Sequence, residues 1–161
     1  MQAQLLILHN AAGGSSAVAL SGVGVVSAQQ TRVMTEYRYA PLDYYFMTSR
    51  DRDKTLLDAV AGWARTGQSF NVLVTEAADR LGISRYYFDQ VARNGQRGSH
   101  FYTLVETEKT LLASLNPNNL QAPRLPYNEG VDSYAFAPLV EGVGGSCAAG
   151  LTPVYRLFRG N

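Results

Sequence analysis

Residues 100–115, HFYTLVETEKTLLASL, repeat the pattern of residues 45–60, YFMTSRDRDKTLLDAV, without a gap. Both stretches place an aromatic residue, a threonine and a Lys-Thr-Leu-Leu run at the same spacing. Self-similarity of this kind marks a repeated structural unit, so we expect two copies of one block. The matched positions are Phe46 and Phe101, Thr48 and Thr103, Asp53 and Glu108, and residues 54–57 and 109–112.

Each copy is predicted to be a strand that leads into a short helix. The aromatic run that opens the copy favours a strand. A threonine then precedes an acid by three residues, Thr48 with Asp51 and Thr103 with Glu106, which is the spacing of a helix-capping box. In the first copy Ser49 or Asp51 could cap the helix instead.

An apolar stripe follows in each predicted helix, because large aliphatic residues recur at positions i, i+1 and i+4. The first helix should end near Gly62 and the second at Asn116-Pro117. Another strand then closes each unit, over residues 67–74 and 130–137, and the helix should cover one end of a sheet. The stripes are Leu56, Leu57 and Val60 in the first copy and Leu111, Leu112 and Leu115 in the second.

The predicted fold class is mainly β with short helices (α+β), built from pseudo-symmetric repeats of strand, strand, helix and strand. A repeat domain should span residues 31–161, with unit one at about 33–74 and unit two at about 84–138. Residues 152–161 resemble the start of a third unit, because Pro153–Phe158 is similar to Ser84–Phe88.

Composition limits the function classes. The 161 residues carry a net charge of +1, which gives no overall attraction to nucleic acid or to an anionic membrane. No apolar run approaches the roughly 18 residues of a membrane span. Ten tyrosines against two lysines favour an extracytoplasmic β protein, secreted or at the cell surface. Cys147 is the only cysteine, so the chain forms no internal disulfide.

The first 31 residues contain no Lys, Arg, Asp or Glu and are predicted to form strand, turn and strand. A signal peptide with its apolar core at residues 17–26 is the alternative. Residues 8–25, LHNAAGGSSAVALSGVGV, resemble the last hairpin of bacterial immunoglobulin-like domains of the choice-of-anchor, abnormal-spindle-like type. The resemblance implies that residues 1–30 are a fragment of such a β-sandwich and that the chain is part of a larger protein.

Five short motifs follow one another along the chain, at residues 36–46 (EY…DYYF), 62–70 (GWARTGQSF), 85–87 (RYY), 99–103 (SHFYT) and 147–156 (CAAGLTPVYR). By these motifs, about three quarters of the chain resembles a bacterial secreted repeat family of unknown function. Ser84 and Lys109 stand where members often have cysteine, and Tyr44 replaces the family's first histidine. The resemblance implies a non-catalytic surface module.

A helix-turn-helix over residues 75–94 is a rival prediction, with Gly82 in the turn. Arg85 and Arg93 could then meet phosphates or bases. Such a motif needs a third helix to complete a core, and the flanking segments favour strands. DNA binding is therefore the weaker alternative, and no nucleic-acid partner is expected.

Catalytic signatures are absent from the sequence. His9 and His100 are the two histidines, no His/Cys group has metal-ligand spacing, and no GxSxG, P-loop or GxGxxG motif occurs. We expect no enzyme activity, cofactor or metal. The predicted function is adhesion or carbohydrate binding, with a glycan or cell-wall polymer as partner; a structural spacer is the alternative. The candidate ligand-binding residues are Trp63, Arg65, Tyr44, Arg85, His100 and Tyr102.

Overall fold

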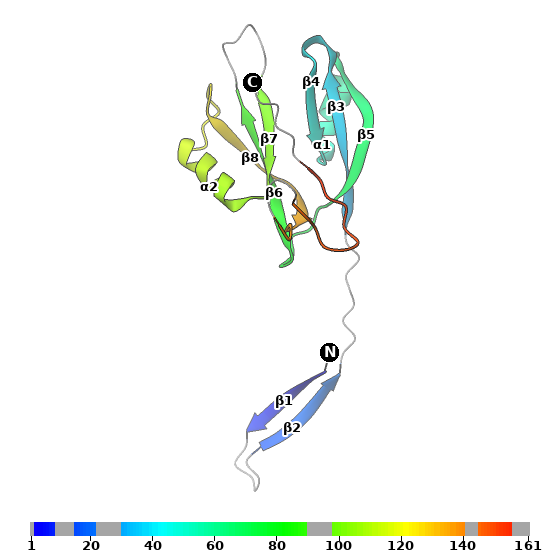
Figure 1. Cartoon of the computed structure of the whole chain (residues 1–161), viewed down its shortest axis with the longest axis vertical. Helices are drawn as coiled ribbons and strands as arrows, with labels where there is room; N and C mark the ends of the chain where they lie inside the picture. Colours follow the sequence, from blue (N-terminus) through cyan, green and yellow to red (C-terminus); the bar gives the residue numbers. More distant parts are fainter. Residues whose placement is uncertain (1, 9–14, 22–29, 90–97, 141–144, 156–161) are drawn as a thin grey trace.

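A computed structural model describes residues 2–8, 15–21, 30–89, 98–140 and 145–155 of the chain (Figure 1). These residues form a mainly β fold with two short α-helices, so the predicted α+β class is confirmed at that level. The elements are β1 (Gln2–Leu8), β2 (Ser15–Ser21), β3 (Thr31–Tyr39), a 3-10 turn (Ala40–Leu42), β4 (Tyr44–Thr48), α1 (Asp51–Ala59), β5 (Trp63–Leu73), β6 (Arg80–Phe88), β7 (Ser99–Thr103), α2 (Glu106–Leu115) and β8 (Pro126–Phe136).

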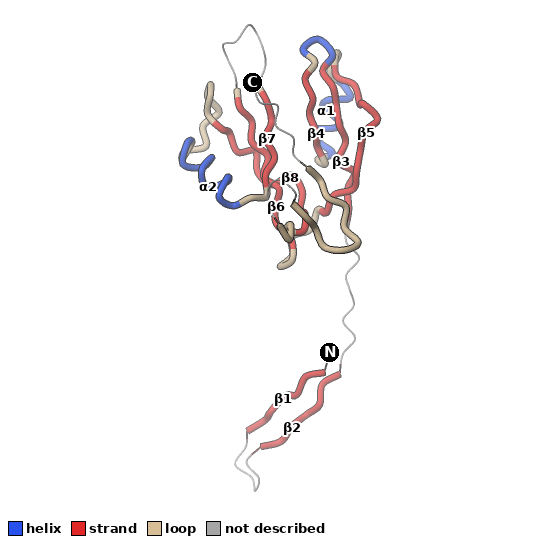
Figure 2. The backbone as a smooth tube through the Cα atoms, viewed as in Figure 1, coloured by secondary structure: helices blue, strands red, loops and turns tan. Residues whose placement is uncertain are grey.

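Six antiparallel strands form one sheet in the order β4-β3-β5-β8-β6-β7. The strands β3, β4 and β5 with α1 make a first half, and β6, β7 and β8 with α2 make a second half with the same order of elements. In each half the first strand lies between the other two (Figure 2). The order strand, strand, helix, strand therefore occurs twice, beginning at residue 80 rather than 84 in the second half.

The threonine at the end of β4 or β7 binds a different acid from the one predicted. Thr48 accepts a hydrogen bond from the amide of Arg50 at 3.0 Å and donates one to Asp53 at 2.9 Å. Thr103 makes the equivalent bonds to Val105 and Glu108. The predicted pairs with Asp51 and Glu106 are wrong. The N-cap of each helix lies two residues beyond the threonine, at Arg50 or Val105, and the threonine bonds to the acid at the third helical position.

The acids at the first helical position bind lysines instead. Asp51 lies 3.7 Å from Lys54, and Glu106 lies 3.4 Å from Lys109. Both acids still lie where the positive end of the helix dipole favours negative charge. The same ion pair at the same place in both helices extends the correspondence between the two halves.

The predicted apolar stripes are only partly covered. Leu112 is buried and Leu57 is partly buried, but Leu56 and Val60 of α1 are 56% and 51% exposed. In α2, Leu111 and Leu115 are 59% and 55% exposed. Each helix packs mainly against one strand, α1 on β5 and α2 on β8, so only one row of side chains is covered rather than a full face.

Glycines mark a bend inside β5 and β8. Gly67 and Gly130 have φ angles of 88° and 86°, and the pairing register shifts beside each of them. A glycine with positive φ at a register shift is a β-bulge, which twists a strand without ending it. The prediction that these strands begin at the glycines is therefore wrong: β5 and β8 each begin four residues earlier.

The register also shows which side chains share a face. Tyr37 pairs with Phe46 and Thr35 with Thr48, and directly opposed residues point to the same side of a sheet. That side carries α1, because Tyr37 donates to Asp58 of the helix. In the second half Ser84 shares the α2 face with Thr103. The buried apolar residues are Met34, Tyr37, Phe46, Val72, Leu73, Tyr86 and Leu112.

The predicted N-terminal hairpin and the predicted third unit lie only partly within the described residues. The N-terminal strands β1 and β2 pair antiparallel, as expected for a hairpin, while its connection at residues 9–14 and residues 22–29 lie outside the described part. Residues 152–155 belong to no strand, and the rest of the expected third unit, residues 156–161, also lies outside.

The helix-turn-helix alternative for residues 75–94 is wrong where the structure describes it. Residues 80–88 form the strand β6, which pairs with both β7 and β8. Arg85 therefore lies in a sheet and not on a recognition helix. Residues 90–94 lie outside the described part of the chain. Strand pairing on both sides outweighs the local helical pattern.

Replacing Gly67 by alanine should lower the free energy of unfolding by about 1–2 kcal/mol, because a Cβ clashes with the backbone at positive φ. No neighbouring atom lies within 4 Å of the position that the new Cβ would take, so the cost comes from the backbone alone. Urea unfolding measures the loss. Gln68→Ala, one residue along the same exposed stretch of β5, is the control and should leave stability unchanged; equal effects of the two variants would contradict the bulge.

Candidate functional site

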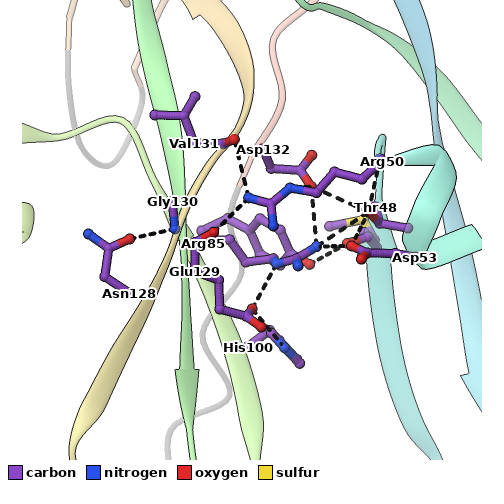
Figure 3. Close-up of polar contacts among 12 residues, drawn as sticks. Thr48, Arg50, Asp53, Arg85, His100, Asn128, Glu129, Gly130, Val131 and Asp132 are labelled. Carbon is purple, nitrogen blue, oxygen red and sulfur yellow. Dashed lines mark hydrogen bonds and ion pairs between the residues drawn. The ribbon is translucent and has the colours of Figure 1, made fainter. Parts of the chain in front are cut away.

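Side chains, more than backbone, join the two halves of the sheet. Between β5 and β8 the ladder has one pairing position, Leu73 with Tyr134. Across the remaining junction, β4 and α1 of the first half meet β6, β7 and β8 of the second (Figure 3). The α1 face of the first half therefore lies against the face of the second half that points away from α2.

Arg85 is the centre of this junction. It is 3% exposed, and its guanidinium bonds to Asp53 at 2.7 Å, to Glu129 at 2.8 Å and to Asp132 at 3.2 Å. It also lies over the ring of Phe46, 5.0 Å from the centroid. One cation thus contacts carboxylates from both halves, which is the arrangement that a buried charge requires.

A second arginine completes the ion cluster, which we define as Arg50, Asp53, Arg85, Glu129 and Asp132. Arg50 donates to the carbonyls of Glu129 and Val131 at 2.9 and 3.2 Å and lies 3.5 Å from the Asp132 carboxylate. Asp132 also accepts the amide of Ser49 at 3.3 Å. The carboxylate of Asp132 has no exposed surface, so these contacts replace its hydration.

Electrostatics inside the cluster favour the ionised forms. Burial alone would raise the pKa of Asp53, but the hydrogen bond and the charge of Arg85 outweigh it and hold the pKa below the ordinary value. Burial opposes ionisation of Glu129 in the same way, and bonds to His100 and Arg85 lower its pKa. Burial would lower the pKa of Arg85, but its carboxylate partners raise it.

His100 connects this cluster to an aromatic surface. Its Nε2 lies 3.2 Å from the Glu129 carboxylate, and its Nδ1 is hydrogen-bonded to the hydroxyl of Tyr44. The Tyr44 hydroxyl, the His100 imidazole and the Glu129 carboxylate thus lie in the order found where a base activates a nucleophile. Burial, with the charges of Tyr87 and Glu129, raises the pKa of Tyr44 despite Arg85, so the phenol keeps its proton and is a poor nucleophile.

A hollow of about 150 Å³ opens where Tyr44 and His100 meet. We call it the aromatic hollow. Both halves contribute, because its walls come from β3, β4, β5 and the 3-10 turn of the first half and from β6 and β7 of the second. It is lined by Tyr39, Leu42, Tyr44, Trp63, Tyr87, Gly98 and His100.

The rings of the aromatic hollow stand at angles to one another. Trp63 lies 5.2 Å from Tyr39 at an interplanar angle of 41°, and 5.7 Å from Tyr44 at 81°. His100 lies 5.0 Å from Tyr87 at 40°. Gly62 helps to place Tyr39, because a Cβ there would come within 2.7 Å of its ring. A ligand in the hollow would therefore meet rings from several directions.

The structure brings together some of the six candidate binding residues and separates others. Tyr44, Trp63 and His100 line the aromatic hollow. Arg85 is buried in the ion cluster, and Tyr102 donates to the carbonyl of Met47 across the junction. Arg65 lies elsewhere, paired with Asp58 at 2.6 Å.

Sequence reasoning missed Tyr39, Leu42, Tyr87 and Gly98. Tyr39 and Tyr87 were detectable in part, since each stands in a strand that the repeat predicts and pairs directly with Tyr44 or His100. What the sequence lacks is any signal that these two strand pairs, from different halves, face each other.

Other site classes are not found in the described chain. Among the described residues no group of three His, Cys, Asp or Glu side chains could hold a metal ion. Within the same residues no helix has both the length and the apolar character needed to cross a bilayer.

No protein-family model matches the chain, and no curated protein or solved structure shows significant similarity to it.

Arg85→Met should cost about 3–5 kcal/mol of unfolding free energy, because it leaves buried carboxylates without their cation. Chemical unfolding monitored by circular dichroism gives the value. Arg38→Met is the matched control: Arg38 pairs with Asp43 at 2.7 Å, but both side chains are exposed, so little change is expected. A small effect at Arg85 would show that the junction does not depend on it.

The lowered pKa values of Asp53 and Glu129 predict a loss of stability in acid. Their ionised forms stabilise the fold above the unfolded-state values of 3.8 and 4.5, and this contribution is lost as the pH falls through the lower folded-state values. Between about pH 5 and pH 2, the wild-type protein should therefore lose more stability than Asp53→Asn. Asp51→Asn, at an exposed position, should lose stability with falling pH as the wild type does. If the unfolding free energies of all three proteins fall in parallel with pH, ionised Asp53 does not stabilise the fold.

Proposed function

We propose that this protein is a non-catalytic binding module that takes one ring of a glycan in the aromatic hollow. The observation that carries the proposal is the concentration of four aromatic side chains and His100 around one small opening. Its volume, about 150 Å³, is below the roughly 300–1,000 Å³ of pockets for drug-sized ligands. The hollow therefore suits a single ring or the end of a chain.

Sugar chemistry agrees with this lining. A pyranose ring has apolar C–H faces and hydroxyls around its edge, while tyrosine and tryptophan combine an apolar ring with a polar tip. Trp63 is neither fully buried nor fully exposed, so it can pack on neighbours and still meet a ligand. A core tryptophan sealed from solvent would not support this role.

Absence of catalysis is part of the proposal. The Tyr44–His100–Glu129 chain is the nearest approach to a reactive group, and the raised pKa of Tyr44 opposes its use as a nucleophile. We assign the chain a positioning role instead: it fixes the tyrosine and histidine rings that form one wall of the hollow.

An extracytoplasmic location and a larger parent protein belong to the same proposal. They rest on the tyrosine-rich, lysine-poor composition and on the resemblance to secreted repeat proteins. We further propose that the two halves descend from one block and that the β1–β2 hairpin is the remnant of an immunoglobulin-like domain. Equivalent bulges, helices and lysine–acid pairs in the two halves support the common origin.

A structural spacer is the second candidate function, and the ion cluster favours it. A buried network that joins both halves would hold them at a fixed angle whether or not a ligand is present. The two functions differ in one respect, because a spacer makes no use of the partly exposed aromatic hollow.

Trp63→Ala should weaken glycan binding by roughly tenfold or more, as expected when a central aromatic contact is removed. A glycan array followed by titration calorimetry on the best ligand measures the change. Phe70→Ala is the matched control, since Phe70 lies on the same strand, is 38% exposed and does not line the hollow. No binding to any glycan or cell-wall polymer would support the spacer. Equal losses in both variants would contradict the aromatic hollow as the binding site.

A further inference from the structure

We propose that the aromatic hollow selects a sugar that carries a positive charge, an amino sugar with a free ammonium group. The inference rests on the proposed glycan-binding function and adds the charge of the ligand to it. It is drawn from the balance of charges around the hollow and from the kind of side chain that lines it.

The lining offers rings rather than permanent cations. None of its seven residues is lysine or arginine, and its aromatic members are three tyrosines, one tryptophan and one histidine. Aromatic faces carry negative electrostatic potential and attract ammonium groups, tryptophan most strongly. Because the Trp63 ring is steeply inclined to that of Tyr44, a bound group can contact the two rings from different sides.

The ion cluster adds a net negative charge beside the hollow. It holds three carboxylates, Asp53, Glu129 and Asp132, against two guanidiniums, Arg50 and Arg85, and three negative against two positive charges leave an excess of one negative charge. Glu129 is the member that reaches the hollow, through its contact with His100 at 3.2 Å.

The field of Glu129 extends into the wall of the hollow itself. After burial and Tyr87, its charge contributes to the raised pKa of Tyr44, with Arg85 opposing it. Among the residues that the structure describes, the exposed ion pairs closest in sequence to the lining residues do not offset the excess. Arg38 pairs with Asp43, and Arg65 pairs with Asp58, so each of these pairs is neutral.

A neutral sugar would use only part of this environment. Its C–H face would pack on the rings, but it carries no positive charge that the negative potential could attract. An ammonium group on the same ring would add a cation–π contact and an attraction to the cluster without any further change in the protein.

The test compares two forms of one oligosaccharide on the intact chain: the β-1,4-linked glucosamine tetramer and its fully N-acetylated counterpart. Titration calorimetry should show the free amine binding roughly threefold to thirtyfold more tightly. Acetylation removes the charge and keeps the ring, so the comparison isolates the ammonium group. Trp63→Leu should reduce this preference, because leucine fills space but has no π face.

Each outcome separates the two proposals. Equal or tighter binding of the acetylated tetramer would overturn the charge selection and leave glycan binding in place. Absence of binding to both tetramers, together with a blank glycan array, would overturn both. A preference for the free amine that survives unchanged in Trp63→Leu would contradict the assigned contact. Trp63→Phe keeps a π face and should retain the preference.

Discussion

A buried guanidinium is the centre of the side-chain contacts that join the two halves of this sheet. Arg85 binds carboxylates from α1 and from β8 while lying over the ring of Phe46. The backbone offers little alternative, since β5 and β8 share one pairing position. Breaking a buried pair leaves an uncompensated charge, whereas forming it returns only part of the desolvation cost. The cluster therefore fixes the relative position of the halves more than it adds net stability.

That position determines what the rest of the molecule can do. The α1 face of the first half lies against the face of the second half opposite to α2, so the two helix-covered faces do not meet each other. Thr48 and Asp53 bind each other and also Arg85 of the second half, whereas their counterparts Thr103 and Glu108 bind each other on the α2 side. The two copies have similar local structure and different surroundings, which is how Asp53 of the first half can bind Arg85 of the second while its counterpart Glu108 stays within its own half.

The aromatic hollow is a consequence of the same packing. Tyr44 on β4 and His100 on β7 come from opposite edges of the sheet and meet only because the halves face each other. His100 then links the hollow to Glu129 and so to Arg85. Ring positions and cluster charges are therefore not independent: a shift of the arginine would move the histidine wall and change the potential that a ligand meets.

Local order was available in the amino-acid sequence. The repeat of residues 45–60 at residues 100–115 predicted both helices, the strands before and after them and the α+β class, because these depend on patterns within one unit. The predicted starts of two strands, at Gly67 and Gly130, were wrong, because a glycine that permits a bulge cannot be distinguished in the sequence from one that bounds a strand. The capping partners failed because a shift of two residues in the helix start selects another carboxylate.

Arg85, Tyr44, Trp63, His100 and Tyr102 were all singled out from short motifs, but their separation into a buried charge cluster and an aromatic hollow was not. That division depends on which face of the second half meets the first. Strand periodicity states that Arg85 and Tyr86 point to opposite sides, and it does not state which side is covered. The sequence determined the units and their faces, and only the tertiary structure decided the pairing of those faces, because it depends on contacts between residues that lie as far as 32 and 84 positions apart.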